Sequence, residues 1–142
     1  MSTAEAEQLF GDEHVRRYVE SDGEVGYIWR EGSTILVLTT TGRTSGEPRT
    51  NPLIFGWDGD NPVIVASKGG APDHPGWFKN IEANPEVGVQ VKADRFRARA
   101  RVAEGEERDR LWPMMNGIWK HYDEYQAKTD REIPVVVLER IG

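Results

Sequence analysis

The pattern of hydrophobic and polar positions predicts several short strands and few helices. Residues 33–41 form an apolar run rich in β-branched side chains, which favours a buried strand. In residues 87–91 and 95–102, hydrophobic and polar side chains alternate, as is typical of half-buried strands. Further strand-like runs cover residues 49–57, 62–67 and 134–138. Together these runs predict a mainly β fold with flanking helices, a small β-barrel of about six strands.

A proline and three helical stretches refine this picture. Pro52 interrupts the run at residues 49–57, which indicates a sheet edge, a bulge, or a point where a ligand replaces a neighbouring strand. An amphipathic pattern predicts a helix over residues 5–20, and a second helix over residues 74–83 can take Asp73 as its N-cap. Residues 104–129 are helical in composition, with a kink or break expected at an internal proline and glycine.

Two glycine-rich, basic turns, Gly42–Arg49 and Ser67–Gly70, carry most of the candidate chemistry. Because a strand pair joins them, they can lie side by side at one edge of a sheet. Backbone amides, Arg43, Arg49 and Lys68 would then face one anionic ligand, such as a phosphorylated cofactor. Each turn alone is also typical of an ordinary hairpin or a flexible connection, so the argument depends on the pair.

A stripe of aromatic residues marks the helical region near the C-terminus. Trp112, Met115, Trp119 and Tyr122 recur at helical spacing, and Tyr125 follows. Such a stripe is more often part of the core. The less common alternative is a wall of a pocket for a planar substrate, in which tyrosine hydroxyls donate protons or orient the substrate.

Length, charge and cysteine content limit the classes of protein to which this chain can belong. The 142 residues are a typical length for one domain, and we expect a single domain over residues 1–142 with residues 1–32 as an N-terminal helical extension. The net charge of −6 disfavours nucleic-acid binding, and the N-terminal helix has too few basic residues to favour membrane binding. There are no cysteines, no apolar run near the about 20 residues that a membrane span needs, and no signal-peptide core. We therefore expect a soluble, cytoplasmic protein.

Two further patterns have a simple interpretation. The arginines that alternate along residues 95–101 indicate a solvated strand face paired to carboxylates, because the chain is acidic overall. His14, His74 and His121 have neither the spacing of metal ligands nor a carboxylate partner apparent in the sequence. We expect no metal site and no Ser–His hydrolase chemistry.

The residues at the two basic turns and at the C-terminus resemble a known family. The segments LTTTGRTSGEPRTNPL, VASKGGAPDHPGWFKNIEANP and YDEYQAKTDREIPVVVLE occur in this order and resemble the deazaflavin-dependent nitroreductases of actinobacteria. The match runs from about Ile35 to Glu139, and residues 1–32 carry little of it. This family has a split β-barrel related to FMN-binding, pyridoxamine-oxidase-like barrels. Its cofactor is coenzyme F420, a deazaflavin with a phosphate and a glutamate tail.

The resemblance implies a role for each matched position of the cofactor site. The residues expected to hold the phosphate and tail are Arg43, Thr44, Arg49 and Lys68. The residues expected to line the deazaflavin ring are Asn51, Pro52, Ala66, Ser67 and Gly69. Those expected to support the ring pocket from the helix are Trp77 and Asn80.

On the substrate side, Tyr122 and Tyr125 match tyrosines of the family's substrate pocket, and with Ser67 they are the candidate catalytic residues. Trp119 stands where the nitroimidazole-activating member has a tyrosine, and this departure leaves prodrug activation open at this point.

We therefore expect an F420H2-dependent oxidoreductase that transfers a hydride to an electron-poor small molecule such as an enone, a quinone or a nitroaromatic compound. The reduced deazaflavin supplies the hydride, so the protein needs no side-chain nucleophile. Two alternatives remain at this point: an FMN-dependent enzyme of the related barrels, and a non-catalytic protein that binds deazaflavin or lipid anions. A monomer and a homodimer are both compatible with the sequence.

Overall fold

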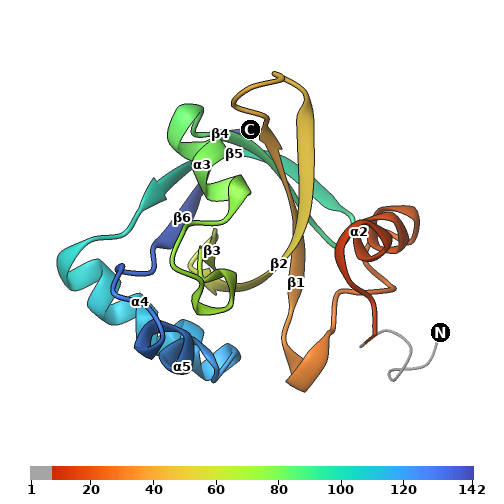
Figure 1. Ribbon diagram of the computed structural model, residues 1–142. Helices are drawn as coiled ribbons and strands as arrows, with labels where there is room; N and C mark the ends of the chain where they lie inside the picture. Colours follow the sequence, from red (N-terminus) through yellow and green to blue (C-terminus); the bar gives the residue numbers. More distant parts are fainter. Residues whose placement is uncertain (1–7) are drawn as a thin grey trace.

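Six antiparallel strands close into a barrel, as the hydrophobic pattern predicts (Figure 1). The computed structural model describes residues 8–142. Around the barrel the strands follow the order β1-β2-β3-β6-β5-β4. They are β1 (Ile35–Thr41), β2 (Pro48–Asp58), β3 (Asn61–Val65), β4 (Glu86–Val91), β5 (Asp94–Val102) and β6 (Val135–Arg140). The expected mainly β fold with about six strands is confirmed.

Strand β5 illustrates how the sequence pattern builds the barrel. Phe96, Ala98 and Ala100 are buried in the main core, while the intervening arginines are exposed. This is the alternation that a pleated strand imposes on a sheet with one solvated face. Three of the four arginines form the expected ion pairs: Arg95 with Asp22, Arg97 with Glu86, and Arg101 with both Glu107 and Glu139. Arg99 forms none with the described residues.

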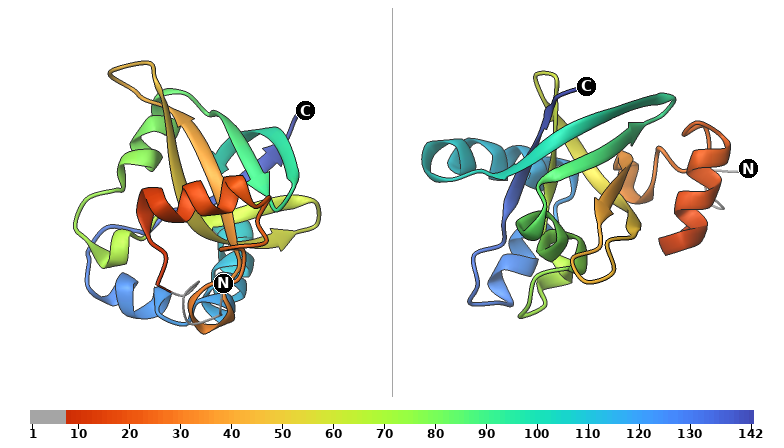
Figure 2. Two further views of the ribbon diagram at one scale, coloured as in Figure 1. Left: turned by 90° about the vertical axis from the view of Figure 1, so that its right-hand side faces the viewer. Right: turned by 90° about the horizontal axis from the view of Figure 1, so that it is seen from above.

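The helices lie on the outside of the barrel, with α2 and α4 on different sides (Figures 1 and 2). They are α2 (Gly11–Glu20), α3 (Gly76–Ala83), α4 (Gly105–Ile118) and α5 (Tyr122–Ala127). Two short 3₁₀ turns, η1 (Arg30–Gly32) and η2 (Lys68–Gly70), connect other elements. No helix in residues 8–142 has the length and apolar composition that crossing a membrane requires.

The expected break in residues 104–129 follows Ile118, next to Gly117, while Pro113 lies within α4 without ending it. The expected N-cap of the preceding helix is wrong. Helix α3 begins at Gly76, and the residue at its N-cap position is Pro75 rather than Asp73. The Asp73 carboxylate instead forms ion pairs with Lys68 and Lys79, because its side chain lies too far before the helix to cap it.

The barrel has an open edge along the first half of β2. Residues from Pro48 to Ile54 pair with β1, whereas pairing with β3 begins only at Phe55. Pro52 lies in this half, where its missing N–H leaves no gap in a second ladder. The expectation that Pro52 marks a strand edge is confirmed. The open edge leaves one side of the β2 backbone available to a ligand.

The N-terminal segment packs against this same part of the barrel. Val15 and Tyr18 of α2 form a hydrophobic cluster with Ile35 and Val37 of β1. The Tyr18 hydroxyl donates a hydrogen bond to the Ile35 carbonyl at 2.9 Å. The helix expected over residues 5–20 is observed from Gly11 to Glu20, and its residues 5–7 lie outside the described part of the chain. The single-domain assignment, the N-terminal extension and the cytoplasmic location all stay predictions.

Candidate active site

The two basic turns meet beside the open edge of β2. Arg43 in the β1–β2 turn, Arg49 at the start of β2, and Lys68 in η2 all line one cavity of about 600 Å³. Neither arginine has an ion-pair partner among the described residues, so their positive charge is available to a ligand. This arrangement is the one that the spacing of the turns predicts, and it suits an anion such as a phosphate.

Helix α3 holds Arg43 in place. The Asn80 Oδ1 atom accepts hydrogen bonds from Arg43 Nη1 at 2.8 Å and from the Arg43 main-chain nitrogen at 3.2 Å. Asn80 is buried, and its Nδ2 donates to Thr40 Oγ1 at 3.1 Å. Arg43 Nη1 also donates to the Gly76 carbonyl at 3.3 Å. Asn80 therefore lines the cavity and also orients one of its cationic side chains.

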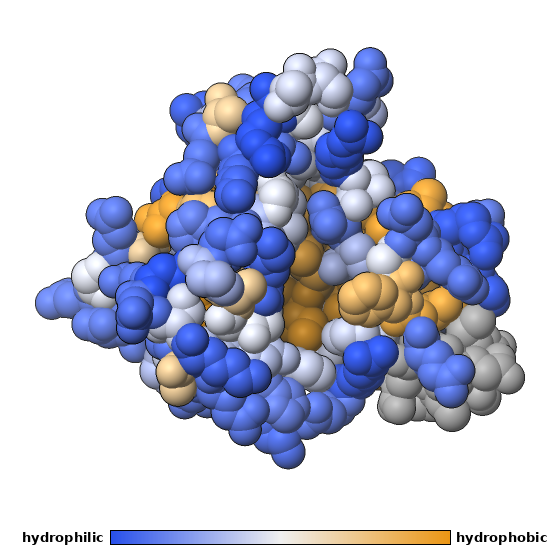
Figure 3. Space-filling model, in the orientation of Figure 1, coloured by the Kyte–Doolittle hydropathy of each residue, from blue (hydrophilic) through white to orange (hydrophobic). Residues whose placement is uncertain are grey.

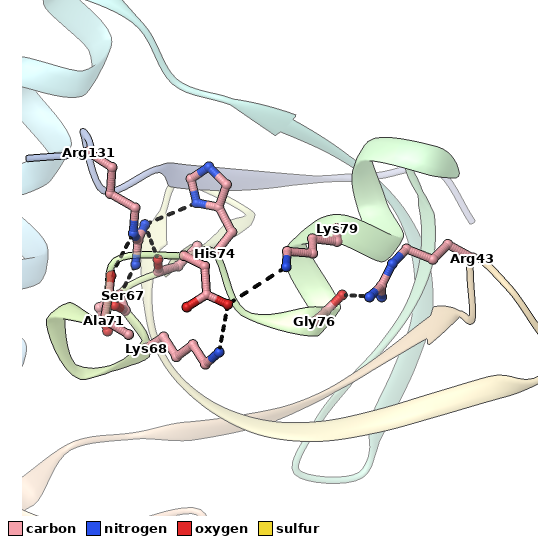
Figure 4. A network of polar contacts seen from close by, with 10 residues as sticks. Arg43, Ser67, Lys68, Ala71, His74, Gly76, Lys79 and Arg131 are labelled. Carbon is pink, nitrogen blue, oxygen red and sulfur yellow. Dashed lines mark hydrogen bonds and ion pairs between the residues drawn. The ribbon is translucent and has the colours of Figure 1, made fainter. Parts of the chain in front are cut away.

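The η2 loop has a strained backbone. Lys68 has a φ of 47°, followed by Gly69 at 63° and Gly70 at 84°. Left-handed conformations are costly for a lysine, and such strain persists only where surrounding contacts enforce it. The Lys68 ammonium lies 3.2 Å from an Asp73 oxygen, and this hydrogen bond lowers the pKa of the Asp73 carboxyl (Figure 4).

An aromatic cavity of about 460 Å³ adjoins the basic one. In the orientation of Figure 1, the molecular surface has a hollow in its middle, with hydrophobic side chains at the floor and hydrophilic ones around it (Figure 3). The walls of the aromatic cavity include Trp29 and Trp119, whose rings are stacked with 5.9 Å between their centroids and 22° between their planes. Asn51, Lys68, Pro75 and Trp77 line both cavities, so the two cavities are direct neighbours.

Three polar side chains of the aromatic cavity have no hydrogen-bond partner among the described residues. They are Asn51, Ser67 and Tyr122. Burial raises the pKa of the Tyr122 hydroxyl, so at neutral pH it is a neutral group able to donate a hydrogen bond. The Tyr125 hydroxyl differs, because it accepts a hydrogen bond from Trp119 Nε1 at 3.3 Å.

The aromatic stripe near the C-terminus serves as both core and pocket wall. Met115 and Tyr122 are buried in a hydrophobic cluster beneath α4 and α5. Trp119, Tyr122 and Tyr125 also line the aromatic cavity. Trp112 does not line it, and its Nε1 donates to Asp123 Oδ1 at 2.6 Å. The stripe is therefore divided between core and cavity wall, and the role of its tyrosines toward a substrate stays a prediction.

The other expected cofactor residues divide into two groups. Pro52 and Gly69 line the aromatic cavity, and Trp77 lies buried between the two cavities. Thr44 is exposed on the β1–β2 turn, and Ala66 is fully buried in the main core. Neither Thr44 nor Ala66 is among the described residues that line either cavity.

Sequence reasoning missed the contribution of the N-terminal segment. Phe10, His14 and Trp29 all line the aromatic cavity, although residues 1–32 carry little of the family resemblance. His14 is buried, and its Nε2 donates to the Gly26 carbonyl at 2.8 Å. Burial lowers the His14 pKa and favours the neutral ring. The only signal in the sequence was the amphipathic pattern of the helix, which indicates packing but not its partner.

The absence of an apparent carboxylate partner for His121 is also corrected. Its Nε2 lies 2.7 Å from Glu31 Oε2, and its Nδ1 lies 3.2 Å from Glu124 Oε2. The hydrogen bond to Glu31 is the main reason that the pKa of His121 is raised. This contact joins the N-terminal segment to the α4–α5 connection beside the stacked Trp29 and Trp119. In residues 8–142, no cluster of three or more potential ligands could hold a metal ion.

Comparison with known proteins places these features in one family. The profile of a family described as F420H(2)-dependent quinone reductase matches residues 11–140. An F420H(2)-dependent quinone reductase of Mycobacterium tuberculosis is 41% identical over 130 residues, which cover 89% of this chain and 87% of that protein.

Solved structures agree with this result. An F420-H2-dependent reductase, FDR-A, has 44% identity and a TM-score of 0.69, covering 74% of this chain and 93% of that one. A domain-swapped dimer has 40% identity and a TM-score of 0.73, covering 89% of this chain and 95% of that one. The heme storage protein HutZ of Vibrio cholerae, at 16% identity and a TM-score of 0.59, covers 89% of each chain and shares the fold alone.

Proposed function

The chain belongs to the F420H(2)-dependent quinone reductase family, and on this premise we propose that it transfers a hydride from reduced coenzyme F420 to a quinone. Membership in a family of F420-dependent reductases makes the chain an oxidoreductase and favours an enzyme over a non-catalytic binding protein. It gives no support to FMN as the cofactor. Enones and nitroaromatic compounds, the other acceptors considered, become comparisons in the test.

One observation carries the proposal. The basic cavity of Arg43, Arg49 and Lys68 lies next to the aromatic cavity, and Asn51 and Trp77 line both. A molecule with an anionic tail and a planar ring can therefore occupy both spaces at once. The open edge of β2 offers backbone groups to the ring, and the basic side chains offer charge-assisted hydrogen bonds to the tail. The residues present thus fit the cofactor that the family name implies.

When bound, the reduced cofactor supplies the hydride, and the protein's own residues have three tasks. The basic turns bind the anionic tail. The aromatic walls, including Trp29 and Trp119, hold a planar acceptor and exclude water from it. We propose that three hydroxyl groups orient the acceptor and stabilise the negative charge that develops on it, those of Tyr122, Ser67 and Tyr125. The acceptor gains one hydride and one proton overall, which converts a quinone to a hydroquinone.

Tyr122 is the best placed of these groups for the developing charge. Negative charge builds on a quinone oxygen as the hydride arrives at the ring, and a preorganised donor beside that oxygen lowers the barrier. Tyr122 lines the cavity, and its hydroxyl is protonated at neutral pH and has no hydrogen bond to break among the described residues. We propose the same orienting role for Ser67, whose hydroxyl is also without such a partner.

The test is a cofactor titration followed by turnover. Purified protein is titrated with F420 and, separately, with FMN, and cofactor binding is followed by fluorescence. Oxidation of F420H2 is then followed by absorbance with a naphthoquinone, a cyclohexenone and a nitroaromatic compound. We expect F420 binding and turnover that is highest with the quinone. Binding of FMN without F420, or turnover confined to the enone or nitroaromatic compound, would overturn the proposal.

Assembly forms a separate part of the proposal. We infer that the chain forms a homodimer, which the domain-swapped dimer of a relative with 40% identity supports. Light scattering on the purified protein measures its mass directly, and a monomeric mass at micromolar concentration would contradict this inference.

A further inference from the structure

One arginine outside both cavities holds the η2 loop through several hydrogen bonds. Arg131 follows α5 and was not singled out by its sequence context. Its Nε donates to the Ala71 carbonyl at 2.9 Å, and its Nη2 donates to the Ser67 carbonyl at 2.8 Å. Its Nη1 donates to the Ala66 carbonyl at 3.2 Å and to His74 Nδ1 at 3.0 Å. The guanidinium thus contacts both ends of the loop (Figure 4).

The loop needs such support because of its backbone. Lys68, Gly69 and Gly70 are three consecutive residues with positive φ. Within the turn, the Ser67 carbonyl accepts one hydrogen bond, from the Gly70 main-chain nitrogen at 2.9 Å, and a carbonyl oxygen can accept a second one. Arg131 supplies planar, fixed donors for the carbonyls that it contacts, and a lysine cannot reproduce that geometry with its single ammonium. Burial lowers the pKa of Arg131, so the guanidinium occupies this position despite a desolvation cost.

The loop is also fitted closely against the substrate side of the site. A Cβ atom at Gly70 would lie 2.7 Å from the Tyr125 carbonyl oxygen in α5. The segment that carries Arg131 is fixed in turn by Gln126 of α5, whose Nε2 donates to the Arg131 carbonyl at 2.8 Å. Helix α5, Arg131 and the η2 loop are therefore one connected unit. Ser67 and Lys68 lie at its cofactor end, and Tyr125 lies at its substrate end.

We propose that Arg131 is a positioning residue for the cofactor: its guanidinium fixes the strained η2 loop so that Ser67 and Lys68 face the bound ligand. This inference rests on the proposed function, since it assigns the loop to the cofactor. It makes Arg131 a determinant of cofactor affinity although it lines neither cavity. A side chain that merely stabilised the fold would affect melting temperature without a selective effect on the loop.

The test compares Arg131→Lys with Arg108→Lys. Arg108 is a matched control, because its Nη2 also donates to a main-chain carbonyl, that of Ile133, at 2.8 Å, and it lines neither cavity. Three quantities are measured for each variant: melting temperature, amide hydrogen exchange over residues 67–71 without cofactor, and the Kd for F420. For Arg131→Lys we expect exchange at Gly70 and Ala71 and the Kd each to rise about tenfold or more. For Arg108→Lys we expect both to stay at the wild-type value.

The outcomes separate the two proposals. If the wild-type protein does not bind F420, the proposed function fails, and the exchange experiment still decides whether Arg131 fixes the loop. If the two variants lower the melting temperature alike and leave loop exchange and Kd unchanged, the role of Arg131 is structural and the inference is overturned. Should Arg131→Lys fail to fold, His74→Ala removes only one of the contacts. We then expect smaller increases in loop exchange and Kd, and unchanged values would contradict the inference.

Discussion

The Tyr122→Phe substitution tests most directly whether the aromatic cavity is a catalytic site. It removes one hydroxyl and keeps the ring that packs in the cluster beneath α4 and α5. Because this hydroxyl has no hydrogen-bond partner among the described residues, the folded protein loses no interaction. A lost hydrogen bond of about 1 kcal/mol would lower Tm by roughly 3 °C in a chain of this size, so we expect a smaller change than that.

The effect on turnover is expected to be larger. A hydrogen bond to developing negative charge is worth about 1.5–3 kcal/mol, which corresponds to roughly a ten- to hundredfold decrease in kcat with a quinone. Burial raises the pKa of Tyr122, so the hydroxyl keeps its proton above the usual tyrosine pKa of about 10. The rate should therefore show no loss of this donor up to that pH. The Kd for F420 is expected to stay the same.

Two further variants make the result specific. Tyr125→Phe removes a hydroxyl that accepts the 3.3 Å hydrogen bond from Trp119 Nε1, so here we expect a lower Tm along with a smaller effect on kcat. Tyr27→Phe is the matched control, because Tyr27 is half-buried outside both cavities and its hydroxyl also lacks a partner among the described residues. Steady-state rates and thermal melts are measured for all three. Unchanged kcat with a clearly lower Tm for Tyr122→Phe would refute the reasoning and make Tyr122 an ordinary core residue.

Three other predictions concern charge. The combined Arg43→Ala and Arg49→Ala change should weaken F420 binding in calorimetric titration by about tenfold or more, since each arginine offers charge-assisted contacts; unchanged affinity would mean that both are merely solvated. Asp73→Asn should tighten F420 binding severalfold, because it frees Lys68 and Lys79 from their ion pairs with the carboxylate. Weaker binding would show that the carboxylate instead holds these lysines in the position that binding requires. Glu31 raises the pKa of His121, so the folded state binds this proton more tightly than the unfolded chain does. The pair therefore contributes its full stabilisation below about pH 6.5, the pKa of the unfolded chain. This stabilisation is lost as the pH rises through the folded-state pKa. Melting curves at several pH values should show a larger loss in the wild type than in Glu31→Gln, where only Glu124 still pairs with His121, and identical profiles would contradict it.

The sequence by itself determined the strands and the position of the basic turns. Alternation along β5 fixed which side chains face the core, because a pleated strand sends successive side chains to opposite faces. Arg43 and Arg49 are brought near each other by one hairpin, and short-range chain connectivity is readable from turn residues. Lys68 could be assigned to the same site as these arginines, because the β2–β3 hairpin returns the chain to the sheet edge at which they lie.

Tertiary structure alone decided which distant residues complete the site. Asn80 orients Arg43, Glu31 pairs with His121 across a separation of 90 residues, and Arg131 holds the η2 loop. None of these pairs has a sequence signature, because hydrogen bonds between remote segments depend on how helices dock on the closed barrel. Periodicity records that a side chain is buried, but it does not record its neighbour.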